Sequence, residues 1–261
     1  MRRFAAEYLR ETRRGMWTDR SALAGLDLPN RRRVLDVGCG TGELTTVLSA
    51  ETPSEVVGLD RDPALLAHLS GPAVLGDALS IPFTDDSFDL VVCQALLINL
   101  PDPAVAVREF GRVSGDLVAA IEPDNGAVTI DSTVAAESQL AETARKHYVA
   151  GVNTDVTLGA DAAALFRDAG FTDVSTVRYD HTRTVTVPYA AHELEAAKRK
   201  ALGSGLEKDR KTLLAGDLTA DQYDALRTAW REMGREAIAQ MQAETYEKTE
   251  TVPFYVTVGR V

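Results

Sequence analysis

The sequence predicts an α/β fold built on a doubly wound, mostly parallel sheet. Short apolar runs rich in β-branched residues alternate with segments of helical periodicity, beginning with the run at 31–37 and the helical segment at 43–49. The run at 88–93 is apolar almost throughout, which is typical of a strand in the middle of a parallel sheet. A chain of 261 residues is long enough for one such domain with elaborations.

The elements follow one another in a regular order. Residues 1–17 form an amphipathic pattern that predicts a helix ending near Gly15. Pro63, directly after Asp62, predicts the start of a helix, because proline favours the first helical position. The expected strands are 31–37, 55–60, 72–76, 88–93, 117–122, 173–179 and 251–259. The expected helices are 43–49, 63–69, 103–113, 130–150 and 158–171.

We predict a single domain over residues 1–261 with three parts. Residues 1–29 form an N-terminal helical lid, and residues 30–187 and 250–261 form the core. Residues 188–249 form a helical insertion before the last strand. Within it, Thr219-Ala-Asp-Gln222 is a capping box, and apolar residues then recur at helical spacing from Tyr223 to Met241. This stripe predicts packing against the sheet or a partner subunit, so the insertion is a candidate for a homodimer interface or a lid.

A glycine-rich turn follows the first predicted strand. Gly38, Gly40 and Gly42 alternate with other residues, and such a turn between a strand and a helix brings backbone N–H groups close to a ligand. Asp36 lies two residues before the turn, where its negative charge favours a cationic or amine-bearing ligand over a pyrophosphate. Asp60 ends the second strand, where doubly wound folds place the carboxylate that binds ribose hydroxyls.

The segment Val34-Leu-Asp-Val-Gly-Cys-Gly-Thr-Gly42 resembles the first motif of the class I S-adenosylmethionine-dependent methyltransferases. Residues 76–89 resemble the same family's Gly-Asp-Ala-x-x-Leu-Pro-Phe-x-Asp-x-Ser-Phe-Asp segment. The resemblance covers residues 30–187 and 251–260 and is greatest to the ubiquinone/menaquinone-biosynthesis type, the methyltransferase type 11/25 group. It implies a seven-stranded Rossmann-like sheet whose last strand is antiparallel.

The resemblance implies S-adenosylmethionine as cofactor and S-adenosylhomocysteine as product. Asp36 and the glycine turn would hold the methionine end, and Asp77 would accept from the adenine amine beside Ala78. Trp17 is open to two interpretations, a lid residue over the cofactor or an anchor of the N-terminal helix. The expected cofactor contacts are Trp17, Asp36, Gly38, Cys39, Gly40, Gly42, Asp60, Arg61, Asp77, Ala78 and Gln94.

The acceptor side of the site is less defined. Ligands bind beyond the carboxyl ends of parallel strands, so residues 94–99 should line the site. Many relatives carry histidine before the Leu-Pro-Asp that ends this stretch, but this chain has Asn99 there, which removes an obvious base. Glu122 and Asp124 follow the fifth strand and could steer or deprotonate a substrate, or simply form a turn. His147 is a further candidate base on a predicted helix.

Composition narrows the possible functions. The net charge of −11 argues against general affinity for nucleic acid or an anionic membrane. The two cysteines, Cys39 and Cys93, suggest neither a disulfide framework nor a metal site, and both are expected to be buried thiols. Arg2 and Arg3 are followed by no apolar stretch, so we expect no signal peptide, and no apolar run is long enough to span a bilayer. We therefore expect a cytoplasmic protein without a metal or a membrane partner.

Three functions agree with these features. The first is methyl transfer to a small-molecule substrate by in-line displacement. The second is a methyltransferase acting on tRNA or protein, which a basic face formed by Arg10, Arg13, Arg14 and Arg31–Arg33 could support. The third is a non-catalytic regulatory protein that binds S-adenosylmethionine, because no catalytic base stands out.

Overall fold

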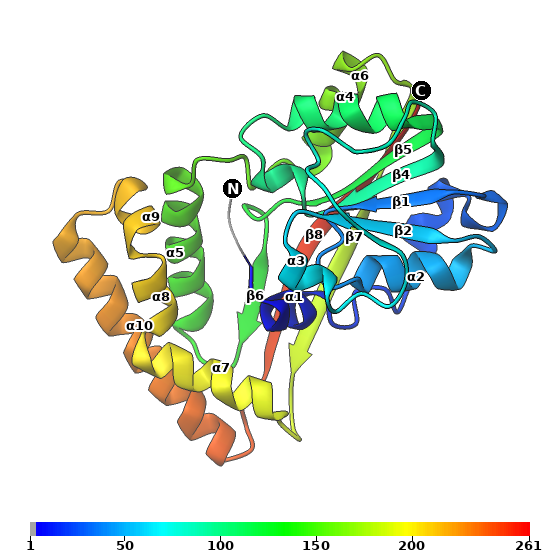
Figure 1. Ribbon diagram of the computed structural model, residues 1–261. Helices are drawn as coiled ribbons and strands as arrows, with labels where there is room; N and C mark the ends of the chain where they lie inside the picture. The colour runs from blue at the N-terminus through cyan, green and yellow to red at the C-terminus, as the bar shows by residue number, and fades with distance from the viewer. Residues whose placement is uncertain (1–3) are drawn as a thin grey trace. The chain divides into compact units, whose positions relative to one another are not determined.

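The computed structural model describes residues 4–261 (Figure 1), so the first three residues of the predicted N-terminal helix lie outside the described part of the chain. The chain divides into two compact units. Unit 1 comprises the residues up to Asp124 together with Leu158–Tyr179 and Pro253–Val261. Unit 2 comprises Asn125–Thr157 and Asp180–Val252. The predicted insertion 188–249 lies in unit 2, which also contains residues 125–157 that we assigned to the core.

Unit 1 is built on the doubly wound sheet that the sequence predicts. Its strands run in the order β3-β2-β1-β4-β5-β8, and β7 pairs with β8. The first five are parallel, and β8 is antiparallel to β5, as expected of the last strand. The strands are β1 (Val34–Val37), β2 (Val56–Asp60), β3 (Ala73–Leu75), β4 (Phe88–Gln94), β5 (Ser114–Pro123), β7 (Thr172–Val185) and β8 (Lys248–Arg260). The end of β7, from Asp180, and the start of β8, up to Val252, belong to unit 2.

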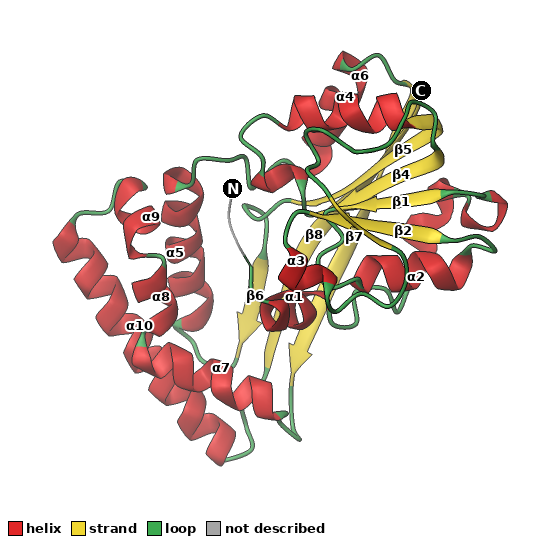
Figure 2. Ribbon diagram, in the orientation of Figure 1, coloured by secondary structure: helices red, strands yellow, loops and turns green. Residues whose placement is uncertain are grey.

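Helices of unit 1 cover both faces of this sheet. Figure 2 shows α4 and α6 on one face and α2 on the other, as right-handed crossovers between parallel strands require. The unit contains α1 (Ala6–Arg13), α2 (Glu43–Glu51), α3 (Pro63–Leu66), α4 (Pro103–Val113) and α6 (Ala162–Asp168). Four 3₁₀ turns join them, η1 (Ser21–Leu26), η2 (Leu28–Asn30), η3 (Leu97–Asn99) and η4 (Gly159–Asp161).

Helix α4 shows why these elements form where they do. It starts at Pro103 and occupies the predicted residues. The N–H groups of the first helical turn have no partner within the helix, so proline, which lacks an N–H, loses no hydrogen bond there. Its buried side chains, Ala106, Val107, Phe110 and Val113, recur every three or four residues and face the core. Phe110 is fully buried there, a burial that contributes roughly 1.5–3 kcal/mol to folding.

Unit 2 contains the end of β7, the start of β8, strand β6 (Thr129–Ser132) and five helices: α5 (Glu137–Gly151), α7 (Ala191–Leu202), α8 (Ser204–Lys208), α9 (Arg210–Ala215) and α10 (Ala220–Gln242). The prediction of a helix over 130–150 is wrong at its start. Residues 129–132 pair instead with the first residues of β8, so the sheet has eight strands where we predicted seven. The β-branched pair Thr129 and Ile130 favours this pairing. The helix begins only at Glu137.

The apolar stripe of α10 is buried inside unit 2. The predicted capping box starts the helix, with Thr219 Oγ1 accepting from Gln222 N at 3.2 Å. Tyr223 and Leu226 then pack with Leu206 and Leu213, which belong to α8 and α9. Further along, Met233, Ala237 and Met241 pack with Ala197 of α7. The stripe thus packs mainly on α7, α8 and α9 and touches the sheet at Val185 of β7. Packing against a partner subunit, and so a homodimer through residues 188–249, stays a prediction.

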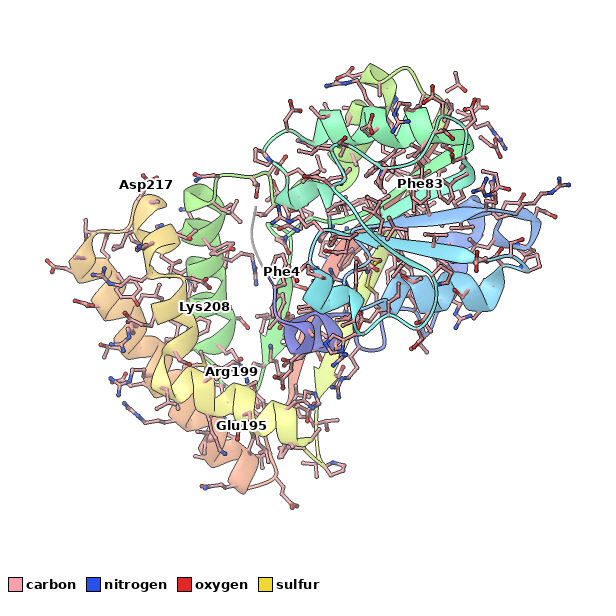
Figure 3. The ribbon with its side chains drawn as sticks, viewed as in Figure 1. Phe4, Phe83, Glu195, Arg199, Lys208 and Asp217 are labelled. Carbon is pink, nitrogen blue, oxygen red and sulfur yellow. The ribbon has the colours of Figure 1, made fainter. Side chains whose placement is uncertain are left out.

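The outer surface of these helices is charged. Figure 3 labels Glu195, Arg199, Lys208 and Asp217, all of which are exposed residues on or beside α7, α8 and α9. Glu195 pairs with Lys198 at 2.6 Å one turn along α7. No helix within residues 4–261 is long and apolar enough to cross a membrane.

Candidate functional site

The glycine turn joins β1 to α2 in a backbone conformation that requires glycine. Gly38 has φ +71° and Gly40 has φ +57°, in the left-handed region that other residues rarely adopt. Both positions are also crowded. A Cβ at Gly38 would lie 2.9 Å from Cδ1 of Leu96, and a Cβ at Gly40 would lie 3.0 Å from Cδ1 of Leu9. The turn is therefore flanked by the segment after β4 on one side and by α1 on another.

Three carboxylates surround this turn. Asp36, at the end of β1, is only 1% exposed and accepts a hydrogen bond from Thr45 Oγ1 at 2.6 Å. Asp60, at the end of β2, accepts from the backbone N–H of Gly40 at 2.9 Å. Glu43 accepts from Thr41 Oγ1 at 2.7 Å. Among residues 4–261, no lysine, arginine or histidine lies within ion-pair distance of any of the three.

This arrangement perturbs Asp36. Burial is the largest cause, and repulsion from Asp60 and Glu43 adds to it, so that the pKa of Asp36 rises to about 7 despite the hydrogen bond from Thr45. A cation at this position would relieve both the burial cost and the repulsion. The turn thus favours a positively charged ligand, as the sequence predicted from Asp36 alone.

The other predicted cofactor residues lie at the same carboxyl edge of the sheet. Asp60 also accepts from the N–H of Asp62 at 2.9 Å, and the next residue along, Arg61, is exposed. Asp77 follows β3, is exposed, and accepts from Leu79 N at 3.0 Å, while Ala78 is buried. Their contacts with a cofactor stay predictions.

Both cysteines are buried thiols. Cys39 is 7% exposed within the glycine turn, and Cys93 is fully buried in β4. Burial raises the pKa of each thiol, and the nearby carboxylates raise it further. Because the thiolate is the reactive form, neither cysteine is suited to nucleophilic chemistry.

Glu122 holds the segment that follows β4. It is fully buried at the end of β5, and its Oε1 accepts from Leu96 N at 3.0 Å and from Leu97 N at 2.9 Å. Its Oε2 accepts from Ile98 N at 3.3 Å. Burial raises the pKa of Glu122 to about 7, although these N–H groups favour the charged form. Glu122 therefore organises the loop rather than being free to deprotonate a substrate.

Asn99 and Ala95 on this loop have an unusual hydrogen-bonding state and an unusual backbone conformation, respectively. Asn99 is 6% exposed, and its Nδ2 donates to Ala95 O at 2.7 Å. Its Oδ1 is buried without a hydrogen-bond partner in the described chain, a state that costs about 1–3 kcal/mol. Ala95 has φ +48°, an uncommon conformation for a residue with a side chain. Asn99 is thus an acceptor held ready for an N–H or O–H group.

The N-terminal segment packs on this same edge within unit 1. Helix α1 is shorter than predicted and ends at Arg13, with Gly15 at φ +70° in the following turn. Met16 is fully buried and accepts from Gln94 Nε2 at 2.8 Å. Trp17 stacks on Tyr179 with ring centroids 5.3 Å apart. Trp17 thus packs on β7, and its contact with a cofactor stays a prediction, while Leu9 of α1 lies against the glycine turn.

The two remaining candidate bases are Asp124 and His147. Asp124 is half-buried at the end of unit 1, and its backbone N–H donates to Pro253 O at 2.9 Å. His147 lies on α5 in unit 2, where its Nδ1 is 2.6 Å from Gly216 O. The imidazole of His147 therefore links α5 to the residue after α9. A role as base for either residue stays a prediction.

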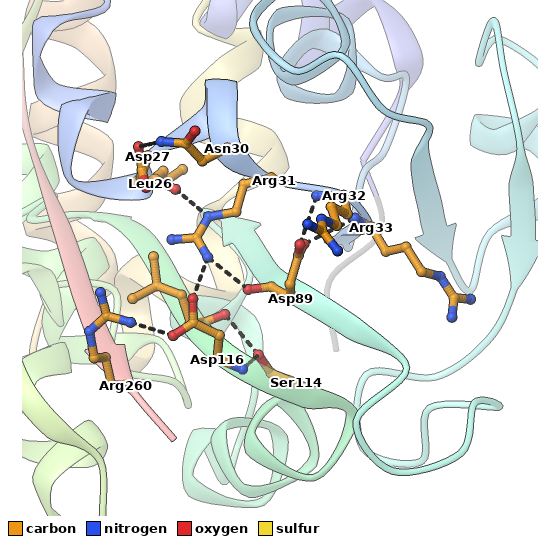
Figure 4. A network of polar contacts seen from close by, with 11 residues as sticks. Leu26, Asp27, Asn30, Arg31, Arg32, Arg33, Asp89, Ser114, Asp116 and Arg260 are labelled. Carbon is orange, nitrogen blue, oxygen red and sulfur yellow. Dashed lines mark hydrogen bonds and ion pairs between the residues drawn. The ribbon is translucent and has the colours of Figure 1, made fainter.

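Arg31, one of the arginines of the basic face predicted for RNA or protein binding, is buried. Arg31 is 5% exposed and donates to Leu26 O at 2.7 Å, to Asp89 O at 3.1 Å and to Asp116 at 2.6 Å (Figure 4). Arg260 pairs with the other oxygen of Asp116. Arg31 is therefore part of a buried network that joins strand ends, and the prediction of a surface containing it is wrong.

Sequence reasoning missed Thr45, Leu9 and the packing of Met16 on Gln94. Thr45 lies one turn into α2, where the family motif had already ended, so only the position of Asp36 could have suggested it. Met16 and Gln94 are 78 residues apart, and nothing local marks their contact.

Comparison with known proteins agrees with this geometry. Residues 35–116 match the family model described as a methyltransferase domain. The chain is 36% identical over 107 residues to a demethylmenaquinone methyltransferase of Lactiplantibacillus plantarum, a match that covers 36% of this chain and 45% of that protein. The chain thus spans less than half the length of that relative.

Two broader matches extend this result. The chain is 30% identical over 212 residues to a malonyl-[acyl-carrier protein] O-methyltransferase of Halorhodospira halophila, covering 77% of this chain and 68% of that protein. A solved structure of a candidate methyltransferase from Bacillus halodurans shares the fold, with a TM-score of 0.51, 14% identity, and coverage of 92% of this chain and 98% of that one. The resemblance that the sequence predicted is confirmed, and the chain belongs to the class I S-adenosylmethionine-dependent methyltransferases.

Proposed function

We propose that this protein transfers a methyl group from S-adenosylmethionine to a small-molecule acceptor. The observation that supports this most strongly is the edge formed by Asp36, Glu43 and Asp60, three carboxylates without a cationic partner among the described residues. The cofactor carries an ammonium and a sulfonium group, so its charge fits this edge. Asp36 and the glycine turn would bind the methionine end, and Asp60 the ribose.

The cofactor supplies an activated methyl group that an acceptor displaces in line. The protein's part is to hold both molecules and to keep water out. Leu9 and Leu96 lie against the glycine turn and provide apolar cover there. Asn99 Oδ1, buried and unpaired, would orient the acceptor by accepting from one of its N–H or O–H groups.

The acceptor would reach the site already nucleophilic. Within unit 1, Glu122 is occupied by three backbone N–H groups and Asn99 is an amide. Neither is free to act as a base, so an ionised oxygen or a free amine suits the site better than a group that must lose a proton. The two relatives are named for acting on demethylmenaquinone and on malonyl-[acyl-carrier protein], and we infer an acceptor of comparable kind.

Methyl-labelled S-adenosylmethionine tests this function. The protein is incubated with the labelled cofactor and a cell extract that is then separated by ultrafiltration. Before separation, hydroxylamine cleaves carrier-bound thioesters and a solvent extract recovers lipids, so that both count as small molecules. We expect the label in the low-mass or lipid fraction, and far less label with Asp60→Asn. Label confined to RNA or protein would favour the second function considered above. No enzyme-dependent label in any fraction would favour a non-catalytic binding protein.

A further inference from the structure

Four cationic side chains gather inside unit 2 of this acidic protein. They come from four separate elements: Arg145 from α5, Arg183 from β7, Lys200 from α7 and Lys248 from β8. Each is half-buried, with 29% of the Arg183 side chain, 19% of Lys200 and 14% of Lys248 exposed. We call these four residues the unit 2 cation cluster.

Two carboxylates, Glu137 and Glu250, form ion pairs with this cluster, and a third, the exposed Glu142 of α5, attracts Arg145 without an ion pair. Glu137 is 1% exposed and pairs with Lys200, while it also accepts from Tyr246 OH at 2.9 Å and from Ser132 Oγ at 2.7 Å. Glu250 pairs with Lys248 at 2.6 Å and with Arg183 at 2.5 Å. Burial alone would raise the pKa of Glu250, but Lys248 and Arg183 outweigh it and lower that pKa to about 2.

The positive charge of the cluster exceeds this compensation. Arg145 donates to Val128 O at 2.5 Å, and no carboxylate within the described chain lies at ion-pair distance from it. Arg183 Nε is buried without a hydrogen-bond partner among the described residues. Burial lowers the pKa of Arg145 and of Lys200, and Lys248 lowers the pKa of Lys200 further by repulsion. Half-buried cations in excess are costly unless an anion joins them.

We propose that the unit 2 cation cluster binds the anionic group, a carboxylate or a phosphate, of a small molecule. Guanidinium groups match the planar oxygen pairs of such anions, and the two lysines add point charges. A nucleic acid fits less well, because the net charge of −11 repels a long polyanion and the cations are half-buried rather than spread over a surface. All of these residues belong to unit 2, so anion binding goes beyond methyl transfer and does not depend on it.

The test uses the full-length protein and two probes, inorganic phosphate and succinate. Each is titrated calorimetrically at constant ionic strength, because screening by added salt would otherwise imitate competition. We expect saturable binding of at least one probe. Tighter binding of phosphate would identify a phosphate-bearing ligand, and tighter binding of succinate a carboxylate-bearing one. Absence of saturable binding of both probes would overturn the proposal.

Arg145→Gln is the decisive variant. Glutamine can still donate to Val128 O, and no carboxylate loses its partner, so we expect the fold to survive and affinity to fall about tenfold. Arg235→Gln, which removes an exposed arginine on α10, is the matched control and should bind as the wild type does. If Arg145→Gln fails to fold, Lys248→Gln replaces it, because Glu250 then keeps Arg183. Wild-type affinity in the folded variant would show that the cluster only joins β7 to β8.

Discussion

Replacement of Asp36 by asparagine should make the cofactor-free protein more stable and yet impair cofactor binding. The pKa of Asp36 is raised to about 7, above its ordinary value of 3.8, mainly by burial. A carboxyl group whose folded pKa is raised stabilises the fold fully below its unfolded pKa, and this contribution is lost as the pH rises through 7. At pH 8 the buried charge therefore costs up to about 4 kcal/mol, by linkage between these two pKa values.

Asparagine removes that cost because it carries no charge. Thr45 Oγ1 can still donate to the amide oxygen, so the local hydrogen bond survives. We expect Asp36→Asn to raise the free energy of unfolding at pH 8 by a few kcal/mol. The gain should shrink toward zero near pH 4, where the wild-type carboxyl is itself neutral in the folded protein.

Cofactor binding should change in the opposite direction. Loss of a charge-assisted hydrogen bond costs about 1.5–3 kcal/mol, which is roughly a 10- to 150-fold increase in the Kd for S-adenosylhomocysteine. In the wild type, affinity should fall up to about tenfold per pH unit below 7, because binding the cofactor's ammonium group requires the ionised carboxylate. In Asp36→Asn this pH dependence should disappear.

Denaturant unfolding at pH 8 and pH 4 and calorimetric titration between pH 5.5 and 8 measure both effects. Asp224→Asn, which removes an exposed charge from α10, is the control and should leave both quantities unchanged. The reasoning is refuted if Asp36→Asn destabilises the cofactor-free protein at pH 8, or if it binds S-adenosylhomocysteine as tightly as the wild type does.

Three other variants probe neighbouring contacts. Glu122→Gln should weaken the hydrogen bonds donated by the amides of residues 96–98 by about 2 kcal/mol, so the hydrogen exchange of these amides should quicken roughly 30-fold. Unchanged exchange would contradict the role given to Glu122. Gly40→Ala places a methyl group 3.0 Å from Leu9 at φ +57° and should lower the free energy of unfolding by about 1–3 kcal/mol and weaken cofactor binding, as calorimetry would show. Arg31→Met should lower that free energy by about 1–3 kcal/mol, because the carbonyl oxygens of Leu26 and Asp89 lose their donor while Asp116 keeps Arg260. The cofactor Kd of the folded fraction should not move.

The fold of unit 1 could be predicted from local patterns. Helix α4 starts at a proline and carries apolar residues at helical spacing, so its bounds followed from the sequence. The acidic site at the carboxyl edge of the sheet could be predicted as well. Asp36 and Asp60 lie near the ends of two recognisable strands, and parallel pairing of these strands brings their ends to the same edge. The different roles of the acidic residues could not be predicted from the sequence, because Glu122 accepts hydrogen bonds from amides about 25 residues away in the chain.

Unit 2 was harder to predict, because its contacts also join residues that lie far apart in the chain. The capping box of α10 is local, and it was found. Strand β6 is short and lies only a few residues before a helix, so three of its four residues fell within the helix predicted over 130–150. The unit 2 cation cluster draws single residues from four elements, and its members carry no shared spacing that a sequence pattern could reveal.

A crystal structure of the protein with S-adenosylhomocysteine tests the central claim most directly. We predict the amino acid end of the ligand beside Asp36 and the turn from Gly38 to Gly40, the ribose hydroxyls on Asp60, and the adenine beside Asp77 and Ala78. The ligand bound at any other edge of unit 1, or in unit 2, would contradict the account.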